Sequence, residues 1–386
     1  MPGDGTVDRV YTPSAHNVPA DTWCSNATNA QIKGNHMSDI VYIGIDLGTS
    51  RTSIATSTGN RETVWSYVGY PKDHVAKKRF GGRDIIYGKE ALDGRLALDL
   101  YRPMAGSSVK QRGAQDDAKR KKAIRDLLRH VVEVAKIPHG STIYGMIGAP
   151  AEASIEGKAT ILETVDDCID SVIICSEPYA VAYGLDFIDD TLVIDSGAGT
   201  TDLCRLHGTM PKSEDQRTHE IAGDSIDQEL ARLIKAKYPH AQFSINMIRA
   251  FKEKHSSVSK HMDKAIVSMP VAGRPEQFDI TELVYQACYT LVPPTVAALQ
   301  DLIATYDPEF QEKMRSHILL GGGGSVIKGL GLAIEQGLEE YGGGHVTTVE
   351  EPQHAGANGA LKFALDMPQE YWKEFTSHRG LEMAAT

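Results

Sequence analysis

The sequence lacks several features that would assign it to a common class of protein. Its five cysteines form no Cys-x-x-Cys pair, so we expect reduced thiols in a cytosolic protein rather than a disulfide framework or a zinc site. No run of about 18 apolar residues occurs, and no transmembrane helix is therefore expected. The most common phosphate-binding loop, Gly-x-x-x-x-Gly-Lys-[Ser/Thr], is also absent.

Positive charge is scarce as well. The chain has 40 lysine and arginine residues against 51 aspartate and glutamate residues, which gives a formal net charge of -11. This balance argues against general affinity for nucleic acids and against adhesion to an anionic membrane by bulk charge. The chain has 386 residues, of which 41% are hydrophobic and 24% charged, and it is long enough for two packed lobes of ordinary size.

The two ends of the chain differ from the rest. Residues 1–36 are polar and have no apolar stretch, so we expect a disordered N-terminal extension rather than a signal peptide. Met37 is an alternative start, in which case this extension is not translated. At the other end, we expect residues 377–386 to form a polar tail.

A repeated unit is the strongest internal signal. Residues 41–50 contain a strand-like apolar run, an aspartate, a glycine turn and hydroxyl residues, and residues 192–201 contain the same order. Aligning Asp46 on Asp195 superposes the turn glycines as well. Two such units in matched phase predict duplicated lobes that face each other.

Between and after these units, helical and strand-like patterns alternate. Apolar residues with helical spacing predict helices over residues 124–135 and 226–237, the second ended by Pro239. Strand-like runs occupy residues 143–147 and 172–175. This alternation predicts an α/β fold.

The paired turns suggest a clamp for phosphate groups. Glycine lets the backbone come close to a ligand, so the N–H groups of both turns can point at phosphate oxygens. The hydroxyl groups that could add to this clamp belong to Thr49, Ser50, Thr200 and Thr201. Asp46 and Asp195 stand where their carboxylates can hold Mg²⁺ through its water ligands. Either turn alone is more typical of an ordinary glycine turn with a capping threonine; the matched pair favours the clamp.

These residues resemble the nucleotide site of a known superfamily. Residues 46–50 and 195–202 resemble the two phosphate motifs of the superfamily that contains actin, heat-shock chaperone ATPases and sugar kinases. Residues 145–150 resemble its first connecting strand, residues 222–224 its glycine turn beside the sugar, and residues 320–325 its adenosine loop. The segments occur in the expected order and span nearly the whole ordered chain.

The resemblance implies an actin-like ATPase fold with two duplicated RNase H-like lobes, a central nucleotide cleft and two small inserted subdomains. It implies the following division of the chain: a lobe I core of residues 37–68, 116–183 and 345–376 with a small subdomain of residues 69–115, and a lobe II core of residues 184–224 and 280–344 with a small subdomain of residues 225–279. Residues 69–115 are charged, rich in glycine and weakly periodic, which is consistent with an insertion.

The resemblance also implies roles for individual residues. Glu177 would orient the attacking water and Asp195 would act with it, while Asp46 and Asp195 would hold Mg²⁺ through water. The residues expected to bind ATP are Asp46, Gly48, Thr49, Ser50, Gly197, Ala198, Gly199, Thr200, Thr201, Gly223, Arg249, Lys252, Glu253, Gly322, Gly323, Gly324 and Val326.

Some of these roles have structural alternatives. Glu177, beside Pro178, is equally typical of a carboxylate that stabilises a helix N-terminus. Arg249, Lys252 and Glu253 fit a solvated helix face as well as a nucleoside contact. Ser53 stands where eukaryotic actin carries a phosphate-contacting lysine, and this departure favours the bacterial branch.

Within the bacterial actins, the chain most resembles the MamK family of magnetosome-forming bacteria. The more specific signals are residues 69–73, Gly-Tyr-Pro-Lys-Asp, and the pair Tyr371 and Trp372 near the end. The resemblance implies a cytoplasmic ATPase that polymerises with itself into nucleotide-dependent filaments and positions magnetosomes. It implies contact with magnetosome-associated proteins, without nucleic-acid binding and without direct membrane insertion.

Four alternatives remain open at this point. Another bacterial actin of cell shape or of plasmid or organelle segregation would share the phosphate motifs. A small-molecule kinase would need a catalytic base in the cleft, and no aspartate beyond the magnesium candidates fits that role. A chaperone-type ATPase would need a further substrate-binding region, for which this chain is too short. A non-hydrolysing scaffold would bind ATP without turnover.

Overall fold

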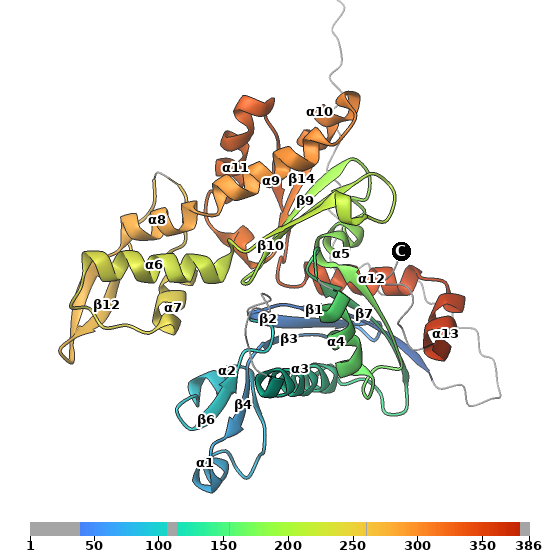
Figure 1. The fold of residues 1–386 in the computed structure, drawn as a ribbon, viewed down its shortest axis with the longest axis horizontal. Helices are drawn as coiled ribbons and strands as arrows, with labels where there is room; N and C mark the ends of the chain where they lie inside the picture. Colours follow the sequence, from blue (N-terminus) through green and yellow to red (C-terminus); the bar gives the residue numbers. More distant parts are fainter. Residues whose placement is uncertain (1–38, 106–113, 154, 260, 379–386) are drawn as a thin grey trace, which may run out of the picture. The chain divides into compact units, whose positions relative to one another are not determined.

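The computed structural model describes residues 39–105, 114–153, 155–259 and 261–378. The predicted N-terminal extension and most of the predicted polar tail lie outside these residues. From Asp39 onward the chain forms one compact unit (Figure 1). Among the described residues, no helix is both long enough and apolar enough to cross a membrane.

A five-stranded sheet with the order β3-β2-β1-β7-β8 forms the centre of the first lobe, called lobe I below. Strand β1 pairs antiparallel with β2 and parallel with β7. The strands of this sheet are β1 (Ile40–Leu47), β2 (Arg51–Thr56), β3 (Arg61–Trp65), β7 (Thr142–Ala149) and β8 (Ser171–Ser176). Both strand-like runs that the sequence predicts after the first unit therefore belong to this sheet.

A second five-stranded sheet has the order β11-β10-β9-β14-β15 and forms the centre of lobe II. Strand β9 pairs antiparallel with β10 and parallel with β14, as β1 does with its two neighbours. The strands are β9 (Thr191–Ser196), β10 (Thr201–Leu206), β11 (Gln216–His219), β14 (Ile318–Gly321) and β15 (Val346–Thr348). Asp46 in β1 and Asp195 in β9 thus occupy equivalent positions, and the predicted duplication is confirmed.

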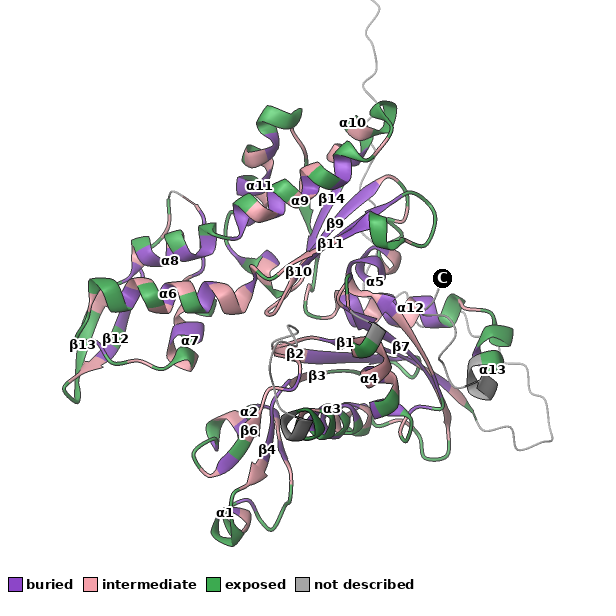
Figure 2. Ribbon diagram, viewed as in Figure 1, coloured by how far each residue is buried: buried purple, intermediate pink, exposed green. Residues whose placement is uncertain are grey.

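Helices cover both sheets, and their buried faces follow the periodicity of the sequence. Those associated mainly with lobe I are α3 (Ala114–Val134) and α4 (Ile155–Val165), and those associated mainly with lobe II are α9 (Val292–Ala304), α10 (Pro308–Ser316) and α11 (Leu330–Leu338). In α3, Leu127, Leu128 and Val131 are fully buried, while Arg125 and Arg129 are exposed. Figure 2 shows this division as buried strands and two-faced helices.

Each lobe carries a smaller group of elements next to its sheet. Beside lobe I, the strands β4 (Val68–Pro71), β5 (Ile86–Tyr87) and β6 (Leu98–Tyr101) form a three-stranded sheet with helices α1 (His74–Arg79) and α2 (Gly88–Asp93). Beside lobe II, the hairpin of β12 (Ile266–Val271) and β13 (Arg274–Asp279) lies with helices α6 (Gly223–Lys237), α7 (Ile245–His255) and α8 (Thr281–Tyr289). The four-part division of the chain remains a prediction in its exact boundaries.

Three of the clusters of buried apolar residues belong to the two lobes: one to each lobe, and a third that both lobes share. One cluster includes Ile43, Ile45 and Leu127 of lobe I, and another includes Leu192, Ile194 and many residues of the lobe II helices. The third, called the shared core here, joins strands of both sheets to two helices that connect the lobes, α5 (Glu177–Gly184) and α12 (Ala355–Asp366).

Helices α5 and α12 approach each other closely because glycine occupies their contact positions. A Cβ atom on Gly359 would overlap the carbonyl oxygen of Ala180, and one on Gly184 would lie 2.8 Å from the Cα of Gly359. Gly44 in β1 is equally close to α12, because a side chain there would overlap the carbonyl oxygen of Ala357. These glycines let both connecting helices pack against the centre of the fold.

In the C-terminal helix α13 (Gln369–His378), Trp372 packs against lobe I. Trp372 is fully buried and stacks on Tyr144 with a ring separation of 5.2 Å. Tyr371 is 46% exposed, so it does not share this anchoring role.

Candidate active site

A cavity of about 1260 Å³ is lined by residues from both lobes. All of the predicted site residues line it except Thr201. Thr201 is buried at the start of β10, where its hydroxyl donates to the carbonyl oxygen of Ile221 at 2.9 Å. The cavity therefore gathers residues from the two repeated turns, the start of α6, helix α7 and the glycine loop after β14.

The two glycine turns meet across this cavity. A Cβ atom on Gly199 in the lobe II turn would lie 2.5 Å from the Oγ1 atom of Thr49 in the lobe I turn. The lobe II turn is closed by a hydrogen bond from the Gly197 N–H to the carbonyl oxygen of Thr200, at 2.9 Å. Glycine at position 199 thus leaves room between the turns, which a larger residue would fill.

The start of α6 is tied to the lobe II turn through the backbone. The N–H of Gly223 donates to the carbonyl oxygen of Gly197 at 3.1 Å, and the N–H of Asp224 donates to that of Ala198 at 2.7 Å. The Lys252 ammonium from α7 donates to the carbonyl oxygen of Gly223 at 2.6 Å. Three separate segments of the sequence are thereby fixed around one edge of the cavity.

Acidic side chains gather at the ends of β1 and β9 and at the first turn of α5. The side chains of Asp46, Glu177 and Asp195 line the cavity, and these residues are half-buried. Burial raises the pKa of Asp46 to about 6, and it raises the pKa values of Glu177 and Asp195 well above their usual range. The negative charges of Asp46 and Asp202 add to the shift for both Glu177 and Asp195.

The position of Glu177 is compatible with both roles that the sequence suggests for it. Ser176 caps α5 by accepting a hydrogen bond from the Tyr179 N–H, and Glu177 is the acidic residue in the first turn. A carboxylate at a helix N-terminus is stabilised by the helix dipole. Its position on the cavity beside Asp46 and Asp195 also gives it access to a ligand there.

Asp202, which the sequence-based list omits, lies behind the cavity wall and contacts two threonines that line the cavity, Thr200 and Thr218. It lies opposite Asp195 in the pairing of β9 with β10 and is buried. Its carboxylate accepts hydrogen bonds from the hydroxyls of Thr200 at 2.7 Å and Thr218 at 2.6 Å, and from the N–H of Ala151 at 2.8 Å. Burial raises the pKa of Asp202 and these bonds oppose the rise. Its place at the end of the second phosphate motif was the available signal.

The glycine loop after β14 packs directly on Asp195 and its neighbour. Gly322 has a φ of 72°, and a Cβ atom there would overlap the carboxylate of Asp195. A Cβ atom on Gly324 would overlap the hydroxyl of Ser196. Gly322, Gly323, Gly324 and Val326 line the cavity, so this loop brings backbone close to the space beside the phosphate turns.

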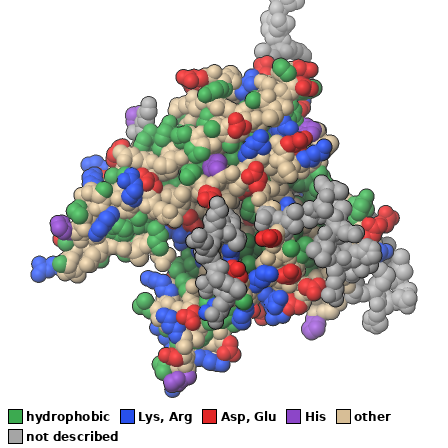
Figure 3. Space-filling view, in the orientation of Figure 1, with side chains coloured by type: hydrophobic (Ala, Val, Ile, Leu, Met, Phe, Trp, Pro, Cys, Tyr) green, Lys and Arg blue, Asp and Glu red, His purple; other side chains and the backbone are tan. Residues whose placement is uncertain are grey.

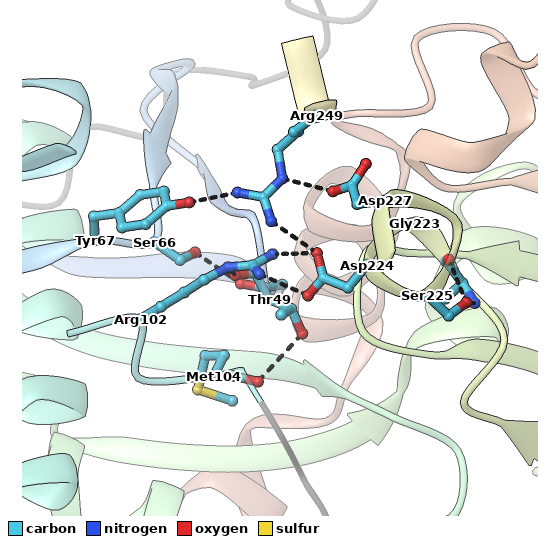
Figure 4. A network of polar contacts seen from close by, with 12 residues as sticks. Thr49, Ser66, Tyr67, Arg102, Met104, Gly223, Asp224, Ser225, Asp227 and Arg249 are labelled. Atoms are coloured by element: carbon cyan, nitrogen blue, oxygen red, sulfur yellow. Dashed lines mark hydrogen bonds and ion pairs between the residues drawn. The ribbon is translucent and has the colours of Figure 1, made fainter. Parts of the chain in front are cut away.

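Arg249 and Lys252 on α7 are engaged by protein partners. The Arg249 guanidinium donates to the hydroxyl of Tyr67 and to carboxylates of Asp224 and Asp227 (Figure 4). The Lys252 ammonium forms an ion pair with Asp227 at 2.7 Å. Glu253, by contrast, is exposed at the cavity rim. Both cations are therefore bound to neighbouring carboxylates, and these contacts fix the wall of the cavity.

Arg102 is a second residue that sequence reasoning missed. It pairs with Asp224, which lies 122 positions further along the chain, and no local pattern marks such a partner. Acidic and basic side chains are interspersed over the face of the molecule that Figure 3 shows.

The residues present fit a magnesium ion that is held mainly through water and phosphate. The carboxylates of Asp46 and Asp195 approach the same cavity and are costly to bury as anions, which a nearby cation would relieve. Within the described part of the chain, no group of three or more acidic, histidine or cysteine side chains could bind a metal directly. Water and phosphate oxygens would have to supply most ligands, as Mg²⁺ commonly requires.

Comparisons with known proteins place this geometry in a family. The model of the MreB/Mbl protein family matches residues 41–371. The actin-like protein MamK of Paramagnetospirillum magneticum is 36% identical over 334 residues, which cover 86% of this chain and 95% of that protein.

Solved structures give the same result. A subunit of the MamK double helical filament superposes with a TM-score of 0.81 at 35% identity, covering 86% of this chain and all of that one. A non-polymerising MamK mutant bound to AMPPNP superposes with a TM-score of 0.65 at 35% identity, covering 85% of this chain and all of that one. The chain therefore belongs to the MreB/Mbl family, as one of its MamK-type actin-like proteins.

Proposed function

We propose that this chain binds ATP with Mg²⁺ in the cleft between its lobes and hydrolyses it to ADP and phosphate. The observation that carries the proposal is the pair of equivalent glycine turns, one from each lobe, that meet at Thr49 and Gly199. Backbone N–H groups of both turns can surround phosphate oxygens from opposite sides. The AMPPNP bound to the MamK mutant supports a nucleotide as the ligand.

Glu177 is the residue proposed to orient the attacking water, together with Asp195. Phosphoryl transfer needs positioning and charge stabilisation more than covalent catalysis, so a carboxylate that holds a water in line suffices. Mg²⁺, when bound, neutralises charge on the phosphates. Asp46 and Asp195 are the residues that would hold its water ligands, and the adenosine would lie against the loop of Gly322 to Val326.

The proposal extends to self-assembly. The filament structure formed by MamK, with which this chain shares its fold, supports a homopolymer as the functional state. A nucleotide whose phosphates touch both lobes can alter the lobe angle when it is hydrolysed, and subunit contacts respond to that angle. We therefore expect ATP to favour filaments and slow hydrolysis to weaken them. By the same relationship, the filaments would act in the cytoplasm to align magnetosomes, through magnetosome-associated proteins.

The first experiment measures phosphate release and filament formation together. Glu177→Ala should form filaments with ATP, seen by light scattering and negative-stain microscopy, while phosphate release falls by about 10²–10³-fold. Asp195→Ala should have the same effect on turnover. The matched control is Glu309→Ala, because Glu309 also lies in the first turn of a proline-containing helix but outside the cavity. Normal phosphate release from Glu177→Ala would overturn its proposed role.

The same assay separates the proposal from its competitors. A small-molecule kinase would release little phosphate without an acceptor, whereas this chain should release it from ATP alone. Binding of ATP without any release would instead identify a non-hydrolysing scaffold. Comparing ATP, ADP and AMPPNP in the light-scattering assay tests whether assembly depends on the nucleotide.

A further inference from the structure

The carboxylate of Asp224 accepts hydrogen bonds from two arginines, Arg102 on the lobe I side of the cleft and Arg249 on the lobe II side. Arg102 follows β6 in the small three-stranded group of lobe I, and Asp224 lies in the first turn of α6 on lobe II. The guanidinium donates from Nη1 to Oδ2 at 2.6 Å and from Nη2 to Oδ1 at 3.0 Å (Figure 4). Such paired bonds are charge-assisted and fix the geometry of both groups.

A second contact crosses between the lobes beside the first. Arg249 on α7 donates from Nη2 to Asp224 Oδ1 at 3.1 Å and from Nε to Asp227 Oδ2 at 3.0 Å. Its Nη1 donates to the hydroxyl of Tyr67 at 2.7 Å. Tyr67 precedes β4, so it belongs to the lobe I side.

Both contacts between the lobes are also connected to the lobe I phosphate turn by hydrogen bonds. Arg102 Nε donates to the carbonyl oxygen of Thr49 at 3.0 Å, and the hydroxyl of Ser66, next to Tyr67, donates to that of Gly48 at 2.7 Å. On the other side, the N–H of Asp224 holds the carbonyl oxygen of Ala198 in the lobe II turn. The same few residues therefore hold the lobes together and touch both turns.

We propose that Tyr67, Arg102, Asp224 and Arg249 form a latch that holds the two lobes closed over the cleft and keeps the phosphate turns in register. The latch rests on the proposed function only for the identity of the ligand that it encloses. Its residues position the turns rather than act on the nucleotide.

The burial of these groups makes the latch stronger than an ordinary surface ion pair. The side chains of Arg102, Asp224 and Arg249 are 16%, 24% and 11% exposed. Exposed ion pairs contribute little to stability. Removing one partner of a desolvated pair costs more, because the charge of the other partner is left buried without a counter-charge. Lobe opening must break the contacts of both arginines with the lobe on the other side, so release of a ligand from the cavity should depend on them.

The first test measures how fast a fluorescent ATP analogue and its ADP counterpart leave the protein in a chase experiment. Asp224→Asn should accelerate both dissociation rates by about tenfold, within the usual range of coupling between sites. Arg102→Gln should do the same, and Tyr67→Phe, which removes only a hydroxyl, should have a smaller effect. The control is Asp190→Asn, away from the cavity: the side chain of Asp190 is 20% exposed, close to the value for Asp224, and pairs with the exposed Lys313.

A double-mutant cycle separates the latch from general destabilisation. Arg102→Gln combined with Asp224→Asn should accelerate release by less than the product of the two single effects, because both substitutions remove the contact between Arg102 and Asp224. Unchanged dissociation in the single variants, or effects that multiply fully in the double variant, would overturn the latch.

The second test does not require nucleotide or hydrolysis. Spin labels on Leu96→Cys and Arg274→Cys, two exposed positions in the small groups of lobes I and II, report the distance between them. Cys24 and Cys168 are replaced by serine to restrict labelling. Without nucleotide, the distance distribution should be narrow and should broaden to longer distances with Asp224→Asn. Identical distributions would reject the latch, whereas absence of ATP hydrolysis in the parent protein would reject only the proposed function.

Discussion

Single carboxyl groups define the electrostatics of the cleft. Asp46, Glu177 and Asp195 come from three different elements, and burial raises the pKa of each. A group with a raised pKa is favoured in its protonated form, so at neutral pH these side chains destabilise the folded chain unless a cation is near. Burial of these carboxylates therefore lowers the stability of the folded chain, while it provides a cavity suited to a ligand that carries a cation.

This arrangement predicts a pH dependence of stability for the protein without metal or nucleotide. The pKa of Asp46 is about 6 in the folded chain against a usual value of 3.8, so the folded state binds the proton more tightly. Its contribution is fully present below the usual pKa and is lost as the pH rises through about 6. Melting temperatures measured in EDTA should therefore fall as the pH rises through about 6. The fall should be smaller in Asp46→Asn, which lacks the titrating carboxyl group.

The comparison with the variant is the control, because other groups also titrate in this range. Profiles of Asp46→Asn and the parent protein that run parallel over the whole pH range would contradict the assignment. Adding Mg²⁺ and ATP should flatten the profile of the parent protein, since a bound cation favours the ionised carboxylates.

At the scale of elements, the contact of α5 with α12 depends on the absence of side chains. Gly359 and Gly184 bring the two helices close, and Gly44 lets α12 lie against β1. Since α5 carries Glu177 at its start and α12 begins near the end of β1, this contact sets the position of the site relative to the lobes.

Gly359→Ala should therefore destabilise the protein although alanine is the better helix former. The added methyl group would overlap the backbone of Ala180, and overpacking of this kind costs about 1–3 kcal/mol. Thermal or denaturant unfolding measures the change. The control is Asn358→Ala, one position earlier on α12, which should be nearly neutral; equal stability of both variants would contradict the close approach.

For the whole molecule, the shared core decides whether the lobes behave as one unit. It includes Tyr144 of lobe I, Leu319 of lobe II and residues of both connecting helices. Among the latter, Phe363 of α12 packs against Tyr179 and Tyr183 of α5 with ring separations of 5.4 and 4.8 Å. Lobes that share buried apolar surface should unfold together.

Phe363→Ala should weaken this coupling. Truncation of a buried phenylalanine costs about 3–5 kcal/mol, and here the loss falls on the cluster that joins the lobes. Calorimetry should show a lower melting temperature and a broader or divided transition. Leu365→Ala, at an exposed position of the same helix, should leave the single transition unchanged. A single sharp transition in Phe363→Ala would argue against a shared core.

The sequence by itself determined the duplicated α/β fold and the two phosphate turns, because their signals are local. Strand, aspartate, glycine and hydroxyl residues recur within ten positions, and periodicity is readable over the length of a helix such as α6. Asp202 was within reach of the same reasoning, since it ends the second motif. The role proposed for Glu177 comes from the family resemblance, because the spacing of residues does not reveal it.

Only the tertiary structure decided how these parts meet. Arg102 and Asp224 are 122 positions apart, and Tyr67 and Arg249 are 182 apart, so chain folding alone makes them neighbours. The sequence predicts Arg249 near the nucleoside; in the folded chain it lines the cavity, and its guanidinium contacts side chains from both lobes. The physical reason is that an ion pair depends on separations of a few ångströms, and sequence patterns carry that information only within one element.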